Sequence, residues 1–235
     1  MDERSSQLLR AVVKRYINTA QPVASTHLAE EGTFSLSSAT IRHILNRLQQ
    51  EGYLDQPHTS SGRTPTDRGY RHYVDQLGST LINKKRLLAL SKKIQSMSDQ
   101  YRTLPRTAAM FLSNYTHTPA VVAWLSTGEV QEAGINELLS QTTKDDLETI
   151  CETATVLSNL DNYLNSLAEL TSEEVAVFIG CENPFLTTSR TSILVRSLTN
   201  KNNERYVMII VGPKRMSYDR NIEILELMSQ LFNNL

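Results

Sequence analysis

Residues 36–71 constrain the fold more than any other stretch, because a helix pattern with a stop signal at each end runs straight into a turn-rich segment. LSSATIRHILNRLQQEG carries its apolar side chains at the i, i+3, i+4, i+7 spacing of a half-buried helix, with Ser37 suited to cap its start and Gly52 its end. The following QPHTSSGRTPTDRGYR holds two Pro, two Gly, five Ser or Thr and three Arg. We expect a hairpin there, with extended residues 53–58 and 64–66 around a turn at 59–63.

Helix patterns also flank this stretch. Residues 2–18 are amphipathic, residues 23–31 fit a short helix closed by Gly32, and a further helix capped by Thr66 contains Tyr70 and Tyr73. Three helices followed by a two-stranded hairpin is the order of a winged helix-turn-helix. We therefore predict a winged-helix DNA-binding domain over residues 1–80.

The pattern changes farther along the chain. Residues 81–101 are Lys-rich and fit an exposed connecting helix, which places a basic helical linker at 81–106. Beyond Pro105, β-rich runs at 120–125, 175–179, 192–198 and 206–211 mix with helical stretches at 144–157, 160–170 and 219–232. We predict an α+β fold for residues 107–235 and two domains in all.

Charge is unevenly distributed, although the net charge is −1. Residues 81–106 carry seven Lys or Arg against one acidic residue, whereas residues 107–235 carry eight against sixteen. The N-terminal half is therefore the part expected to meet a polyanion. No apolar run is long enough to span a bilayer, the acidic start does not resemble a signal peptide, and Cys151 and Cys181 are expected in the core of a reduced, cytoplasmic protein.

The polar face of the helix at 37–52 is the first candidate site. Arg and Asn side chains can bond guanine and adenine edges, and hydroxyls at a helix start suit phosphate. We expect DNA contacts from Ser38, Thr40, Arg42, His43, Asn46 and Arg47. The plainer interpretation, an ordinary solvated helix face, stays open on the residues alone.

The hairpin is the second candidate site. It offers donors for phosphate or the minor groove in His58, Thr59, Ser60, Arg63 and Arg68. We expect Arg63 at the tip to face DNA and Arg71 to brace the hairpin. A surface hairpin whose arginines merely solvate it is the alternative.

Four segments carry a resemblance to a known family. SSATIRHILNRLQQEGYLDQPHTSSGRTPTDRGYRHYVDQL, with PVASTHLAEEG before it, resembles the signature of the HrcA family, the heat-inducible transcription repressors of bacteria. FIGCENP and VGPKRMSY resemble later segments of the same family, in the same order. The resemblance implies a winged helix joined to a GAF-like domain, and a homodimer bound to an inverted-repeat operator, the CIRCE element, upstream of chaperone genes. It also implies that the GroE chaperonin keeps the repressor active.

The sequence departs from this family at one place. The family carries an additional dimerising domain inserted after the first strand of the GAF-like fold. Here FLSNYTHTPAVVAWL is followed at once by STGEVQEAGINELLSQ, which fits family sequence from beyond the insertion. We expect a shortened version that lacks the insert and reduces the GAF-like fold.

The residues outside the DNA-binding half suggest a regulatory role and offer no catalytic motif. Lys214, Arg215 and Tyr218 could form a contact surface for the chaperonin or the DNA-binding domain, unless the segment only folds the chain. No GxSxG, GxxxxGKS or HExxH motif occurs, and no His, Cys or acidic cluster has ligand spacing, so we expect neither an enzyme nor a cofactor or metal. Two alternatives remain: a winged-helix regulator controlled by a small ligand in the C-terminal domain, and a protein-interaction module that never binds DNA.

Overall fold

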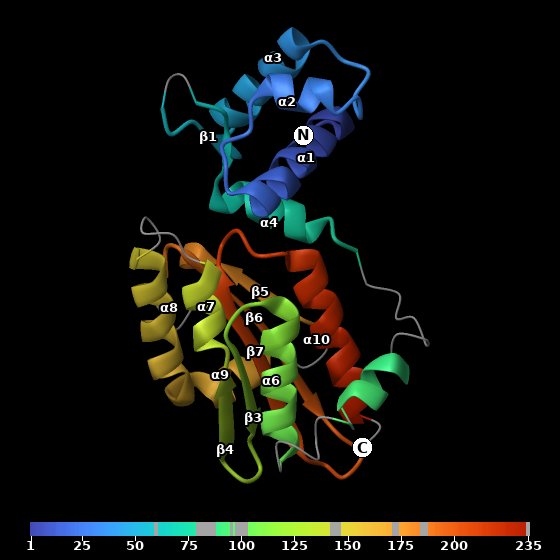
Figure 1. Ribbon diagram of the computed structural model, residues 1–235, viewed down its shortest axis with the longest axis vertical. Helices are drawn as coiled ribbons and strands as arrows, with labels where there is room; N and C mark the ends of the chain where they lie inside the picture. Colours follow the sequence, from blue (N-terminus) through green and yellow to red (C-terminus); the bar gives the residue numbers. More distant parts are fainter. Residues whose placement is uncertain are drawn as a thin grey trace. The chain divides into compact units, whose positions relative to one another are not determined.

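The computed structural model describes residues 1–58, 61–78, 88–94, 96, 103–141, 147–170, 174–183 and 188–233. The chain divides into two compact units, Met1–Gly78 and Ser79–Leu235, both drawn in Figure 1. The predicted turn residues Thr59 and Ser60, and most of the predicted linker at 81–106, lie outside the described residues.

The N-terminal unit is built from helices and one short hairpin. Its elements are α1 (Glu3–Thr19), α2 (Ser25–Glu30), α3 (Ser38–Gln50), β1 (Leu54–Asp55), β2 (Thr64–Pro65) and α4 (Asp67–Asp75). Strands β1 and β2 pair antiparallel. The periodic apolar residues of α1 and α3 are buried together with Leu28 of α2 and the tyrosines of α4: Leu8, Leu9, Val12, Val13, Ile41, Ile44, Leu45, Leu48, Tyr70 and Tyr73. One small core thus fixes where the polar face of α3 lies.

Side-chain caps start three of these helices. The Asp2 carboxylate accepts from the Ser5 N–H at 2.8 Å, the Ser37 hydroxyl from the Thr40 N–H at 3.1 Å, and the Thr66 hydroxyl from the Gly69 N–H at 3.1 Å. Each bond satisfies a backbone donor that the first helical turn leaves without a partner, and a cap of this kind contributes about 1 kcal/mol. The caps predicted at Ser37 and Thr66 are confirmed.

The C-terminal unit centres on an antiparallel five-stranded sheet in the order β4-β3-β7-β6-β5. The strands are β3 (Ala120–Trp124), β4 (Glu129–Ala133), β5 (Ala176–Ile179), β6 (Thr191–Thr199) and β7 (Arg205–Pro213). The α-helices of this unit include α6 (Leu104–Thr116), α7 (Ile135–Gln141), α8 (Leu147–Asn159), α9 (Leu164–Leu170) and α10 (Tyr218–Asn233). Helices α6 and α10 cover one face of the sheet, and α8 and α9 cover the other (Figure 1).

Both faces of the sheet are buried, and the sequence reflects this. Strands β6 and β7 are buried over nearly their whole length. Alternate residues such as Ile193, Val195 and Ile209 pack against Leu157 and Leu167 of the α8 and α9 layer. The predicted α+β class is confirmed, and the predicted strands occur in order with β4 and α7 in addition.

Three expectations for this unit need correction or addition. Strand β4 and helix α7 were not predicted, because EVQEA is a half-polar edge strand that lacks the apolar run of the central strands. Residues 88–94 are helical, and Leu90 and Ile94 are buried, so this part of the predicted exposed linker packs. Cys151 and Cys181 are exposed, and the expectation that they lie in the core is wrong.

Candidate nucleic-acid interface

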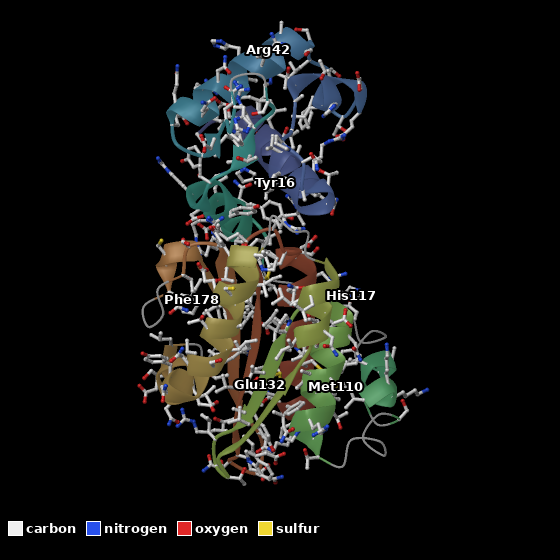
Figure 2. All side chains as sticks on the ribbon, turned by 60° about the vertical axis from the view of Figure 1, so that its left-hand side comes forward. Tyr16, Arg42, Met110, His117, Glu132 and Phe178 are labelled. Atoms are coloured by element: carbon white, nitrogen blue, oxygen red, sulfur yellow. The ribbon has the colours of Figure 1, made fainter. Side chains whose placement is uncertain are left out.

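Helix α3 has one buried and one exposed face. Ile41, Ile44, Leu45 and Leu48 turn into the core, and Thr40, Arg42, His43, Asn46 and Arg47 are exposed. Figure 2 places Arg42 on the outer surface of the N-terminal unit. The exposed face carries cations, an imidazole and an amide, which together can bond base edges and phosphates in a major groove.

The two hydroxyl residues at the start of α3 have different surroundings. The Thr40 hydroxyl lies 2.9 Å from the Ser37 hydroxyl at the exposed helix start. Ser38 is partly buried, and its hydroxyl lies 3.2 Å from that of Ser25, the first residue of α2. Ser38 therefore joins the starts of α2 and α3, and Thr40 is the hydroxyl that a phosphate could reach.

Arg47 is held by the neighbouring helix. Its guanidinium bonds the carboxylate of Asp2 and the hydroxyl of Ser5 at the start of α1, and Glu51 lies 3.9 Å away. The Ser5 backbone N–H, then the Ser5 hydroxyl and Arg47, lower the pKa of Asp2 to about 2, so the carboxylate stays charged. Arg47 thus fixes α3 against α1, although the sequence alone grouped it with the residues expected to contact DNA.

The hairpin turn is closed by Ser61. The Ser61 hydroxyl donates to the His58 carbonyl at 2.7 Å and accepts from the His58 N–H at 3.0 Å, and the Ser61 N–H donates to the same carbonyl at 2.8 Å. The imidazole of His58 is exposed. His58 is therefore bonded to Ser61 through its own backbone, and its exposed imidazole could reach a phosphate.

Arg63 directly precedes β2, so it lies where the loop meets the paired strands and not at the tip, and we call this junction the hairpin base. It forms an isolated β-bridge with Val23, in which the two N–H to O=C distances are 2.8 and 2.9 Å. One terminal nitrogen of its guanidinium donates to the Asn46 side-chain oxygen at 2.6 Å. The structure corrects the expected tip position and connects the hairpin directly to the exposed face of α3.

Arg68 has partners within its own unit. Its guanidinium donates to the Glu51 carbonyl at 2.7 Å, lies 3.3 Å from the Tyr53 hydroxyl, and stacks over the Tyr53 ring at 4.4 Å from the centroid. It thereby satisfies a carbonyl at the end of α3. Arg71, expected to brace the hairpin, lies 3.3 Å from Asp75 on its own helix.

The segment GPKRM of the C-terminal unit forms a turn that is held by a buried side chain. Tyr218 is fully buried, and its hydroxyl donates to the Lys214 carbonyl at 2.8 Å and lies 2.8 Å from the Ser192 hydroxyl. Its side chain is unavailable to a partner, so Tyr218 is removed from the expected contact surface. Lys214 and Arg215 are partly buried.

Among the described residues, no three His, Cys, Asp or Glu side chains gather to hold a metal ion. The described helices also include none that is long and apolar enough to cross a membrane. Sequence reasoning assigned Gly62 only to a tight turn and missed Val23, although these two residues meet and hold the hairpin base.

Comparison with known proteins finds a family model that covers most of the chain. Residues 73–222 match the family model described as "HrcA protein C terminal domain". Curated relatives named "Heat-inducible transcription repressor HrcA" occur in Acaryochloris marina, 45% identical over 124 residues, and in Thermoanaerobacter sp., 38% identical over 121 residues. Each alignment covers 52% of this chain but only 34% and 35% of the relative, so the match spans about a third of their length.

A solved structure shares the fold. It is titled "Crystal structure of a hypothetical protein at 2.2 A resolution", and it aligns with a TM-score of 0.73 at 18% identity over 100% of this chain and 99% of that one. The two structures therefore have the same arrangement of elements.

Proposed function

The chain belongs to the HrcA family, and on that basis we propose that it is a DNA-binding transcription repressor of heat-shock genes and not an enzyme. We propose that the N-terminal unit is a winged helix-turn-helix domain and that the C-terminal unit is a reduced GAF-like domain. The names of the curated relatives support the repressor function. The arrangement of three helices followed by a paired hairpin supports the winged helix.

One observation carries the proposal. The exposed face of α3 presents Arg42, His43 and Asn46, and the hairpin base delivers Arg63 to that same face. An exposed helix face is ordinarily polar, but here the hairpin brings a further cation to that face. A DNA groove would use both the helix and the hairpin.

The proposed roles differ from residue to residue. Arg42, His43 and Asn46 read base edges, and Thr40 meets a phosphate at the start of α3. His58, Thr59 and Ser60 on the hairpin turn position the protein on the DNA backbone. Ser38, Arg47 and Arg68 hold the reading helix in place, because their side chains bond Ser25, Asp2 and Glu51 within the unit.

The family resemblance also supports a proposal for the operator and the regulation. We propose a homodimer on a CIRCE-type inverted repeat, since two-fold protein symmetry matches an inverted repeat. We propose further that the GroE chaperonin keeps the repressor active, that Lys214 and Arg215 belong to a regulatory contact, and that the protein acts in the cytoplasm where operator and chaperonin are found.

Fluorescence anisotropy with two labelled duplexes tests the proposal. The full chain is titrated into a CIRCE-type inverted repeat and into a scrambled duplex at one fixed salt concentration, with and without GroE. We expect at least a thousandfold preference for the inverted repeat, strengthened by the chaperonin. Equal affinity for both duplexes would exclude sequence-specific repression.

Two variants assign the reading face. Asn46→Ala should lower the preference for the inverted repeat by roughly tenfold, since a good base contact contributes about 1–3 kcal/mol of discrimination. Arg10→Ala removes an exposed cation from α1 and serves as the matched control. Arg10→Ala should leave the preference unchanged. If Asn46→Ala weakens binding to the inverted repeat and to the scrambled duplex by the same factor, Asn46 does not read a base.

A further inference from the structure

The backbone of Arg63 is fixed to a part of the chain far from the hairpin. Its N–H and C=O both bond Val23, in the loop between α1 and α2, at 2.9 and 2.8 Å. The preceding Gly62 lies so close to Pro22 and Val23 that a Cβ there would be 2.5 to 2.6 Å from their backbone atoms. The Cα of Arg63 therefore has little freedom to move relative to the core of the unit.

The side chain of Arg63 ends on Asn46. One guanidinium nitrogen donates to the Asn46 side-chain oxygen at 2.6 Å, and another lies 3.4 Å from the Ser61 carbonyl oxygen. A guanidinium has only donors, so the amide oxygen must face it, whichever way an amide could otherwise be turned. The Nδ2 amino group is then the end of Asn46 that remains for a ligand.

Stability of the isolated unit does not favour this arrangement strongly. Burial lowers the pKa of Arg63, and the charge of nearby Arg42 lowers it further. Within the described part of the chain, the buried Nε of Arg63 has no hydrogen-bond partner. Partial desolvation and a neighbouring cation offset part of what the bonds to Asn46 and Ser61 contribute to stability.

We infer that Arg63 is a positioning residue for sequence reading: by holding the oxygen of Asn46, it turns the Nδ2 amino group outward as a fixed donor for an acceptor on a base edge. This inference rests on the proposed function. Guanine N7 and O6, adenine N7 and thymine O4 are the major-groove acceptors such a donor can meet. A phosphate contact by Arg63, in contrast, would carry no sequence information.

The test measures discrimination one base pair at a time. The full chain selects a preferred inverted repeat from a pool of randomised duplexes, and affinities are then measured for every single-base change in it. The Asn46 base pair is defined as the position where Asn46→Ala alone relaxes the preference. Arg63→Met removes the donor at similar length, Arg63→Lys restores a donor, and Arg10→Met is the matched control on an exposed face of α1.

We expect Arg63→Met to reduce discrimination at the Asn46 base pair about tenfold and Arg63→Lys to recover most of it. Asn46→Ala combined with Arg63→Met should lose no more there than Asn46→Ala alone, because both changes remove one contact. Arg10→Met should leave that base pair unaffected. A uniform loss over all duplexes in Arg63→Met, with the base profile unchanged, overturns the inference and assigns Arg63 to a phosphate.

A second variant leaves Arg63 and the hairpin unchanged. Asn46→Asp keeps an oxygen for Arg63 but replaces the outward amino group by an acceptor. The preferred base at the Asn46 base pair should then change to one that offers a donor, such as cytosine. An unchanged preference overturns the inference even if Arg63→Met does not fold. A wild-type chain that selects no duplex overturns the proposed function, and the inference with it.

Discussion

Gly62 offers a direct test of how the hairpin is held, because its substitution by alanine adds one methyl group at a close backbone approach. The new Cβ would lie 2.5 Å from the Val23 carbonyl carbon and 2.6 Å from the Pro22 carbonyl carbon and the Val23 nitrogen. These are backbone atoms that cannot rotate away. The hairpin base must therefore separate from the loop between α1 and α2 by about an ångström to reach an ordinary contact distance.

That separation breaks the bridge between Val23 and Arg63. Its two hydrogen bonds of 2.8 and 2.9 Å would lengthen beyond bonding range, and a bond of this kind contributes about 1 kcal/mol. We expect Gly62→Ala to lower the free energy of unfolding of the N-terminal unit by about 2 kcal/mol. With a urea dependence of about 1 kcal/mol per molar for a unit this small, the midpoint should fall by about 2 M.

Urea unfolding followed by two signals measures this. The single tryptophan, Trp124, lies in the C-terminal unit, so its fluorescence reports that unit, whereas far-UV circular dichroism reports both. Gly62→Ala should shift the unfolding transition of the N-terminal unit, which circular dichroism detects, and leave the fluorescence transition of the C-terminal unit unchanged. Gly78→Ala is the matched control, because nothing lies within 4 Å of a Cβ there. If the two variants unfold at the same urea concentration, the close approach at Gly62 does not hold the hairpin.

Three further predictions concern titration and burial. Burial lowers the pKa of His72 in the folded N-terminal unit, so this unit should lose stability as pH falls below the ordinary histidine pKa of 6.5. The difference between the urea midpoints at pH 7.5 and pH 5.5 should be smaller in His72→Gln than in the wild type. Burial raises the pKa of Glu152, but hydrogen bonds from the Thr191 hydroxyl and the backbone N–H groups of residues 189–191 outweigh burial and lower the pKa. This carboxylate therefore stabilises the C-terminal unit above pH 4.5, and the stabilisation is lost as pH falls through the folded pKa. Glu152→Gln should cost about 2 kcal/mol at pH 7 by tryptophan fluorescence and weaken the acid dependence, and an unchanged acid limb would contradict the role of these bonds. Tyr218→Phe removes the hydroxyl that donates to the Lys214 carbonyl and bonds Ser192 in the core, and it should cost about 1–3 kcal/mol in the same assay; a wild-type midpoint would show that the turn does not depend on this hydroxyl.

Some of the candidate site was predictable from the sequence because it depends on interactions within four residues of the chain. The cap at Ser37, the buried stripe from Ile41 to Leu48 and the cap at Thr66 are local, and each occurs as predicted. The α+β class followed from the change of period beyond Pro105. The edge strand β4 was missed because its half-polar residues give no clear local signal.

The partners of long polar side chains were decided only by the tertiary structure. Arg47 and Arg68 have the same chemistry as Arg42, and the sequence grouped all three as DNA contacts. Folding brings Asp2 to Arg47, and it places Arg68 against Tyr53 and the end of α3, while Arg42 stays exposed. Asp2 lies 45 positions before Arg47, and neither helix period nor turn propensity carries information over that separation.

Arg63 illustrates the same limit most clearly. The sequence by itself determined that a turn rich in hydroxyls and arginines follows a capped, amphipathic helix, and that this order is typical of a family of repressors. Only the folded chain decided that Gly62 lies against Pro22 and Val23, and so that Arg63 reaches Asn46 and not the hairpin tip. The physical reason is that steric fit between distant segments depends on how the whole core packs, whereas caps and apolar periods depend on each residue and its near neighbours.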